Sequence, residues 1–150
     1  MKQGFLKVSA VTPDLRVADC AFNTEQIIAG MKACVAKGSK LAVFPELSIT
    51  GYTCGDLFLQ QPLLVGALDG LAKICEASEE MDLLTVVGLP VAVNHKLYNC
   101  AAFVKDGTLL SLVPKTCIPN YSEFYEARHF TKGPKAAEFV DINGMNVPFG

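Results

Sequence analysis

The chain has 150 residues, of which 51% are hydrophobic and 19% charged, and its formal net charge is −2. This length allows one domain or part of one, and the apolar content predicts a folded core rather than a disordered tail. The low positive charge argues against nucleic acid as the main partner, and no apolar run is long enough to cross a bilayer.

The six cysteines are widely spaced, and no two of them form a C-x-x-C pair. We therefore expect small buried hydrophobic side chains in a reducing compartment, not a disulfide framework. Two histidines without clustered sulfur ligands argue against a zinc site. The N-terminal residues run directly into strand-like alternation without a signal-peptide pattern, so we expect a cytoplasmic protein.

The first half of the chain alternates predicted strands and helices. A crossover of helical length between strands favours parallel pairing, and an unbroken apolar strand indicates a sheet covered on both faces. The predicted elements are a strand over residues 5–11, a helix from a cap at Asn23 or Thr24 to about Lys37, a strand over residues 41–44, a helix after Pro62 and an apolar strand over residues 83–89.

The pattern changes at Pro90. Short strands over residues 91–93, 97–104 and 108–113 predict an antiparallel meander, and residues 139–147 predict a hairpin around Asn143-Gly144. The residues alone therefore predict an α/β fold with a C-terminal antiparallel meander. Because the sequence stops inside an apparent strand, we expect it to be a portion of a longer polypeptide.

Two predicted strands end in the same way. Pro45 ends the strand over residues 41–44 and is followed by Glu46, while Pro114 ends a later strand and is followed by Lys115. In open α/β sheets, ligands bind outside the carboxyl ends of the strands. Each charge alone is better explained as a solvated strand end, so the functional interpretation depends on the two being partners.

Two long motifs carry a family resemblance. F-P-E-L-x-x-T-G-Y over residues 44–52 and V-P-K-x-x-x-P-N-Y-x-E-F-Y-E-x-R over residues 113–128 resemble the nitrilase superfamily of carbon–nitrogen hydrolases. The continuation G-Y-T-C-G-D-L-F over residues 51–58 is similar to one branch, the glutaminase domains of glutamine-dependent NAD synthetases. The resemblance implies the first part of an α-β-β-α sandwich with mixed sheets faced by helices.

The resemblance also implies roles for five residues. Such enzymes hydrolyse amides with a cysteine nucleophile, a glutamate base and a lysine that stabilises the oxyanion. Glu46 matches the base, Lys115 the lysine and Glu126 a second, supporting glutamate; Tyr52 and Tyr121 match positions that line the glutamine pocket. Plainer roles remain open: Glu126 could pair with Arg128, and both tyrosines could simply pack.

The nucleophile has no counterpart in this sequence. The family places it well past the lysine, so we expect it beyond residue 150 and expect the chain alone to be inactive. Cys117 lies two residues from Lys115, and neighbours two apart in an extended segment share a face rather than converge on a substrate. Cys54, in a loop, is about as weak a candidate as Cys117, and Cys100, in a predicted strand, is weaker.

The functional hypothesis is a glutamine amidohydrolase portion that supplies ammonia to a downstream NAD synthetase domain. The implied partners are glutamine, that domain and further copies of the chain, with no nucleic acid or membrane. ATP and magnesium are implied for the synthetase domain, and no cofactor for this chain. The alternatives are another amidase or carbamoylase of the superfamily, or a non-catalytic binding or assembly module.

Overall fold

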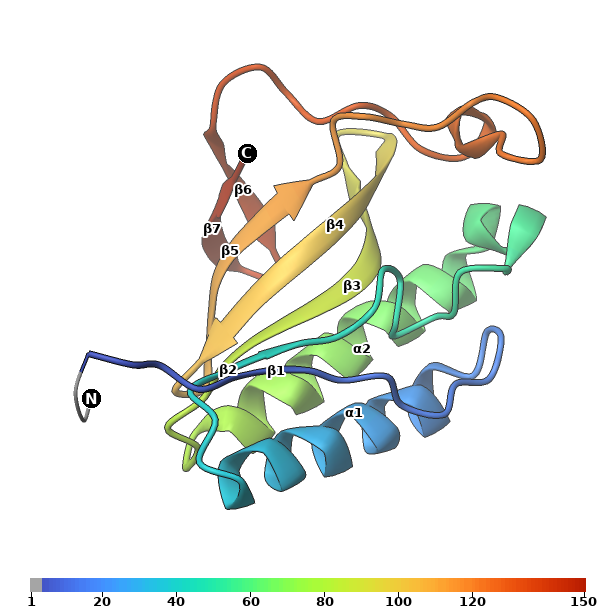
Figure 1. Cartoon of the computed structure of the whole chain (residues 1–150). Coiled ribbons are helices and arrows are strands. Elements are labelled where there is room, and N and C mark those ends of the chain that lie inside the picture. Colours follow the sequence, from blue (N-terminus) through green and yellow to red (C-terminus); the bar gives the residue numbers. More distant parts are fainter. Residues whose placement is uncertain (1–3) are drawn as a thin grey trace.

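Residues 4–150, the part that the computed structural model describes, form one seven-stranded sheet with two long helices on one face (Figure 1). Within that range, no helix is both long and apolar enough to cross a membrane. The elements in chain order are β1 (Val8–Ala10), α1 (Cys20–Ala36), β2 (Leu41–Val43), the 3-10 helix η1 (Gly55–Leu59), α2 (Gln61–Ser78), β3 (Leu84–Val93), β4 (Lys96–Lys105), β5 (Thr108–Pro114), the 3-10 helix η2 (Glu126–Arg128), β6 (Glu138–Ile142) and β7 (Met145–Phe149).

The strand order is β1-β2-β3-β4-β5-β7-β6. Strands β1, β2 and β3 pair in parallel, β3, β4 and β5 form the predicted antiparallel meander, and β7 pairs in parallel with β5 while it closes a hairpin with β6. The three hairpin turns place Asn94-His95, Asp106-Gly107 and Asn143-Gly144 at positive φ, as tight hairpin turns require. The predicted α/β fold with a mixed sheet is confirmed.

Strand β3 passes through Pro90 without a break, so the predicted change of element there is wrong. The reason is the length of its neighbour: β2 pairs with β3 only as far as Val86. Beyond that point β3 has a ladder partner on one side, β4, and the missing N–H of Pro90 interrupts no hydrogen bond to β2.

Helix α1 begins earlier than predicted. Asp19 is its N-cap, with the carboxylate accepting from the Phe22 N–H at 3.0 Å, so a cap at Asn23 or Thr24 is wrong. The Asn23 side chain is instead fully buried and holds the backbone of Arg16 and Ile49. Helix α2 begins at Gln61, with Pro62 in its first turn as predicted.

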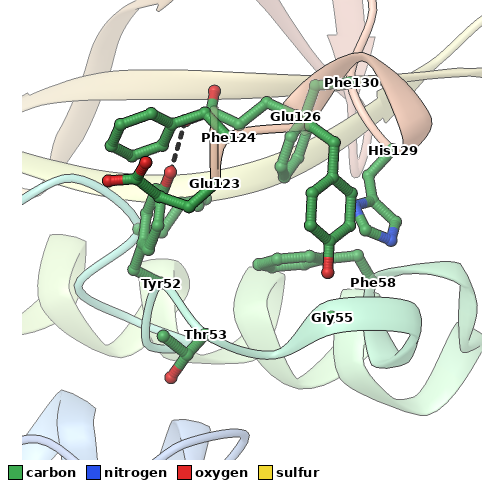
Figure 2. A pocket seen from close by; sticks show the side chains of 11 residues that line it. Tyr52, Thr53, Gly55, Phe58, Glu123, Phe124, Glu126, His129 and Phe130 are labelled. Atoms are coloured by element: carbon green, nitrogen blue, oxygen red, sulfur yellow. Dashed lines mark hydrogen bonds between the residues drawn. The ribbon is translucent and has the colours of Figure 1, made fainter. Parts of the chain in front are cut away.

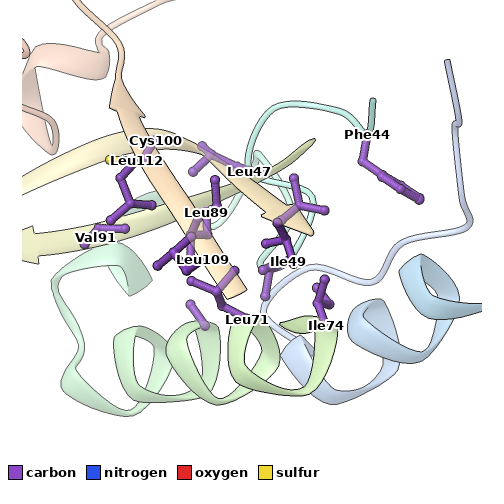
Figure 3. Close-up of a cluster of buried hydrophobic side chains, with 14 of the residues drawn as sticks. Phe44, Leu47, Ile49, Leu71, Ile74, Leu89, Val91, Cys100, Leu109 and Leu112 are labelled. Carbon is purple, nitrogen blue, oxygen red and sulfur yellow. The ribbon is translucent and has the colours of Figure 1, made fainter. Parts of the chain in front are cut away.

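The core lies between α2 and the meander (Figure 3). Leu71 and Ile74 of α2 are buried under a layer of strand side chains that includes Leu89, Leu109 and Leu112. On the opposite face of the sheet the exposed side chains include Val43, Leu110 and Val113, and no helix among residues 4–150 covers them (Figure 1). Coverage of both faces, expected from the apolar strand over residues 83–89, is therefore not provided by the described residues.

Candidate active site

Glu46 stands on a tight turn directly after β2. Leu47 has a φ of 52°, which is unusual for a side chain of its size, and its carbonyl accepts from the N–H groups of Thr50 and Gly51. The Leu47 side chain is fully buried, so core packing supports this strained conformation. The turn therefore directs Glu46 outward at the end of the sheet while the next residue is anchored inside.

Gly88 of β3 makes this turn possible. A Cβ atom at Gly88 would lie 2.3 Å from the Leu47 nitrogen and 2.8 Å from the Pro45 carbonyl oxygen. The Gly88 N–H donates to Ser48 Oγ at 3.3 Å, and its carbonyl accepts from the Ile49 N–H at 3.1 Å. The backbone that carries Glu46 is thus seated on β3 at the one point where β3 has no side chain.

Lys115 reaches the same place from the end of β5. Its backbone N–H donates to the Asn99 carbonyl at 2.8 Å, which extends the β4–β5 ladder by one residue past Pro114. Its ammonium donates to Glu46 Oε1 at 2.6 Å and to the two oxygens of Glu126 at 3.1 and 3.0 Å. The predicted meeting of an acid and an amine from distant parts of the chain is therefore present, with a second acid beside them.

Glu126 enters from η2 and is buried, although it is a carboxylate. Its charge is balanced by Lys115, and Tyr52 Oη donates to its Oε1 at 2.7 Å. The alternative partner considered from the sequence, Arg128, pairs with Asp56 instead. Glu46, Tyr52, Lys115 and Glu126 thus form one connected group, which we call the carboxylate–lysine cluster.

The electrostatics of the cluster favour a charged lysine. Burial alone would lower the pKa of Lys115, but the hydrogen bonds from its ammonium to Glu46 and Glu126 outweigh that effect and raise the pKa above its usual value. Desolvation and the hydrogen bond to Glu126 raise the pKa of the Tyr52 hydroxyl well above its usual range. At neutral pH the cluster therefore presents an ammonium and a neutral phenol, both of which can donate hydrogen bonds.

A second ion-pair group joins the loops on either side of the cluster. The Asp56 carboxylate of η1 accepts from Arg128 Nε and Nη2 at 2.8 and 2.9 Å, and it contacts His129 Nε2 at 3.1 Å. The hydrogen bonds from Arg128 and then from His129 hold the pKa of Asp56 far below its usual range. Residues 51–59 and 121–130, which carry Tyr52 and Glu126, are in this way fastened to each other.

Two hollows adjoin the cluster. Tyr52 and Glu126 line one of about 270 Å³, whose other walls include Phe58, His129 and Phe130 (Figure 2). Glu46 and Lys115 line an open cleft of about 500 Å³ on the uncovered face of the sheet, next to Asn99 and Val113. A small polar molecule in this cleft would meet both an ammonium and a carboxylate.

One further predicted position, Tyr121, lies apart from the cluster. Tyr121 is 69% exposed and packs edge-on against Phe124, with ring centroids 5.7 Å apart, and it does not line either of these hollows. The roles assigned to all of these residues by resemblance stay predictions.

The cysteines divide into buried and exposed ones. Cys100 lines the cleft, but burial raises the pKa of its thiol to about 12, which leaves it protonated and unreactive at neutral pH. Cys54 is buried, and burial raises its pKa as well. Cys117 lines the cleft and is exposed. Residues 4–150 contain no cluster of three or more His, Cys, Asp or Glu side chains that could hold a metal ion.

Three members of the site were not found by sequence reasoning. Asn99 donates from Nδ2 to Glu46 Oε1 at 2.5 Å, Gly88 seats the turn, and Asp56 fastens the loops. The only available signals were weak: an asparagine inside an otherwise apolar strand, and a glycine inside a buried one.

A mixed α/β sheet brings Glu46 and Lys115 together at the ends of β2 and β5, with Glu126 of η2 also bound to the lysine. Residues 7–149 match the carbon-nitrogen hydrolase family, so this chain belongs to that family. The recognition made from the two motifs is confirmed.

Two glutamine-dependent NAD(+) synthetases and an amidase are among the individual proteins that this chain resembles. The chain is 36% identical, over 149 residues, to the glutamine-dependent NAD(+) synthetase of Mycobacterium tuberculosis, a match that covers 99% of this chain and 22% of that protein. It superimposes on the crystal structure of a glutamine-dependent NAD(+) synthetase from Cytophaga hutchinsonii with a TM-score of 0.91 and 26% identity, over 97% of this chain and 25% of that one. An amidase from Nesterenkonia sp. shares the fold at 16% identity and a TM-score of 0.76, over 99% of this chain and 56% of the amidase.

The chain thus spans about a fifth of the length of the curated Mycobacterium relatives that it matches.

Proposed function

We propose that this chain is the N-terminal portion of a glutaminase domain that releases ammonia from glutamine for a synthetase domain of the same protein. The observation that carries the proposal is the position of the Lys115 ammonium, 2.6 Å from Glu46 and 3.0 Å from Glu126. The names of the relatives that cover nearly all of the chain support glutamine as the amide.

The chemistry follows from the charges in the cluster. A cysteine thiol transfers its proton to Glu46 as the sulfur bonds to the carboxamide carbon; Lys115, cationic at neutral pH, stabilises the oxyanion that forms. The C–N bond then breaks, and the proton passes from Glu46 to the departing ammonia. Water cleaves the thioester by the same exchange, which returns the thiol and releases glutamate.

The thiol in this scheme comes from outside the 150 residues. Cys100 and Cys54 are buried with raised pKa values, and Cys117 follows Lys115 on the same segment. In this proposal ATP and magnesium serve the synthetase domain and have no ligands in this chain. We also propose that the protein is cytoplasmic, because its six cysteines form no disulfides. We propose further that it is a homo-oligomer, because apolar side chains are exposed on the uncovered face of the sheet.

The test is a glutaminase assay on the complete protein that contains this sequence. Glu46→Gln and Lys115→Ala should each lower kcat at least about 100-fold, because one removes the base and the other the oxyanion partner. Glu25→Gln and Lys73→Ala make the same changes on exposed helix positions and should be silent. Near-normal glutaminase activity in either the Glu46→Gln or the Lys115→Ala variant would contradict the proposed function.

Another amidase of the family is the second candidate, favoured by the shared fold of the Nesterenkonia enzyme. A panel of amides and carbamoyl compounds separates the two, because glutamine turnover should exceed that of aliphatic amides. A non-catalytic module would show no turnover of any of them. Glutamine bound across Glu46 and Lys115 in crystals of the complete protein would also exclude it.

A further inference from the structure

Asn99 is a buried amide that contacts both charged members of the cleft. It lies on β4, is 4% exposed, and pairs across the sheet with Pro90 of β3. Its Nδ2 donates to Glu46 Oε1 at 2.5 Å, and its backbone carbonyl accepts from the Lys115 N–H at 2.8 Å. A single residue in the centre of the sheet therefore connects the exit of β2 to the exit of β5.

The two oxygens of the Glu46 carboxylate are not equivalent. Oε1 accepts from both Asn99 Nδ2 and Lys115 Nζ, whereas no group among residues 4–150 donates to Oε2. An oxygen whose two lone pairs already accept from two donors is a poor place for an incoming proton, and an oxygen without donors is a good one. The geometry therefore separates an anchoring oxygen from an oxygen that can take a proton.

Lys115 alone could not impose this arrangement. Its ammonium has three donors on a flexible stem and is shared with both oxygens of Glu126, so it restricts the direction of the Glu46 carboxylate only weakly. The Asn99 amide is held in a buried strand, so its donor has a nearly fixed position. Glu46 itself is 42% exposed and has a solvent-facing alternative if the amide is removed.

We propose that Asn99 is a positioning residue for the hydrolysis: it holds Glu46 by Oε1 so that Oε2 faces the cleft and accepts the thiol proton. The S–H bond breaks and the Oε2–H bond forms as sulfur bonds to the amide carbon; the same proton leaves with ammonia when the C–N bond breaks. This inference rests on the proposed glutaminase function and adds the residue that decides which oxygen reacts.

The decisive variant is Asn99→Asp in the complete protein. The change keeps size and shape but replaces the N–H donor by a carboxylate next to that of Glu46, and two carboxylates in contact raise the pKa of one of them. Near pH 8 the introduced carboxylate is charged and repels Glu46, so kcat for glutamine hydrolysis should fall about 100-fold while KM changes less than about threefold. As the pH is lowered, the introduced carboxyl protonates and again offers a donor to Glu46.

The ratio of variant to wild-type kcat should therefore rise as the pH falls from about 8 to about 5.5. A purely structural role for Asn99 would give a loss that is independent of pH. Asn94→Asp adds the same charge at the exposed β3–β4 turn and should leave the ratio flat. The titratable groups that share this corner with Asn99 are Glu46, Tyr52, Cys100, Lys115, Cys117 and Glu126, and all are unchanged in both variants.

A second pair of variants covers the case in which Asn99→Asp does not fold. Asn99→Ser retains a short donor and Asn99→Ala removes it, so the serine variant should keep at least about five times the kcat of the alanine variant. Equal kcat values for this pair, or a flat ratio for Asn99→Asp, would overturn the role of Asn99. If Glu46→Gln stays active, the proposed function fails instead; if Glu46→Gln is inactive and Asn99→Asp is normal, only this inference fails.

Discussion

At the scale of single residues, the cluster is a lysine between two carboxylates that differ in exposure. Glu126 is only 8% exposed and Glu46 is 42% exposed. The buried glutamate is fixed by Lys115 and Tyr52, so it serves to hold the ammonium in place. The exposed glutamate lines the cleft, where a bound molecule could contact it.

Lys115→Met should lower the free energy of unfolding by about 1–2 kcal/mol at neutral pH, because it leaves two carboxylates without their shared cation. The folded-state pKa of Lys115 is raised, so the stabilisation from its charge is fully present below its ordinary value of 10.5 and is lost as the pH rises through the higher folded value. Urea unfolding of both proteins between pH 7 and about pH 11.5 checks this. The difference should be flat up to about pH 10 and then shrink.

A difference in unfolding free energy that shrank toward the low end of this pH range, and not toward the high end, would contradict the predicted pH dependence. Lys73→Met removes an exposed lysine from α2 and should give a difference near zero at every pH.

At the scale of elements, the ends of β2 and β5 could be predicted from the sequence, but the residues of other strands that contact these ends could not. Pro45 and Pro114 mark the ends of β2 and β5 by their missing N–H groups, so Glu46 and Lys115 could be placed from local chemistry. Asn99 is marked only weakly, as a polar residue inside an apolar strand, and its contact with Glu46 forms only when β2 and β4 are brought together in the sheet. The start of α1 was missed because Asn23 is a good cap by type, but it is used by the tertiary structure.

Gly88→Ala tests how the Glu46 turn is seated on β3. The added Cβ would lie 2.3 Å from the Leu47 nitrogen and 2.9 Å from the Glu46 carbonyl carbon, and neither backbone atom can move without shifting the turn. We expect a loss of about 3 kcal/mol or more in unfolding free energy. Gly66→Ala is the matched control, since its Cβ would lie 3.5 Å from Cys20 in ordinary contact, within α2.

Because alanine is the better helix former, the Gly66→Ala variant should be about 0.5–1 kcal/mol more stable. Denaturant melts of the three proteins measure both effects. Similar stability of the Gly88→Ala protein and the wild type would show that the turn is not held by close backbone approach.

Asp56→Asn tests the link between the loops at η1 and η2. Loss of the Arg128 and His129 contacts should speed amide hydrogen exchange in residues 51–59 and 121–130 and leave the sheet unchanged. Because the folded-state pKa of Asp56 is lowered, its charge stabilises the folded state above about pH 3.9, and this stabilisation is lost as the pH falls toward the folded-state pKa. Asp82→Asn breaks the ion pair to Lys40 and should affect neither loop.

At the scale of the whole molecule, one face of the sheet is packed and the other is open. Helices α1 and α2 cover the packed face (Figure 1). Val43, Leu110 and Val113 remain at least 40% exposed on the other. This asymmetry could not be predicted, because the apolar run over residues 83–89 is equally suited to a sheet covered on both faces. In β3, Thr85, Val87 and Leu89 are fully buried, whereas Leu84 and Val86 are partly exposed.

The open face and the unpaired edges of β1 and β6 predict that the 150-residue chain self-associates. Light scattering at rising concentration should give a mass above the 16.1 kDa of one copy. Leu110→Glu places a charge on the open face and should shift the chain toward the monomer, because burial of a carboxylate against apolar neighbours is unfavourable. Val65→Glu adds the same charge on an exposed position of α2, where it should leave the mass unchanged. A clean monomer for the unaltered chain, or equal effects of the two substitutions, would show that the open face does not drive association.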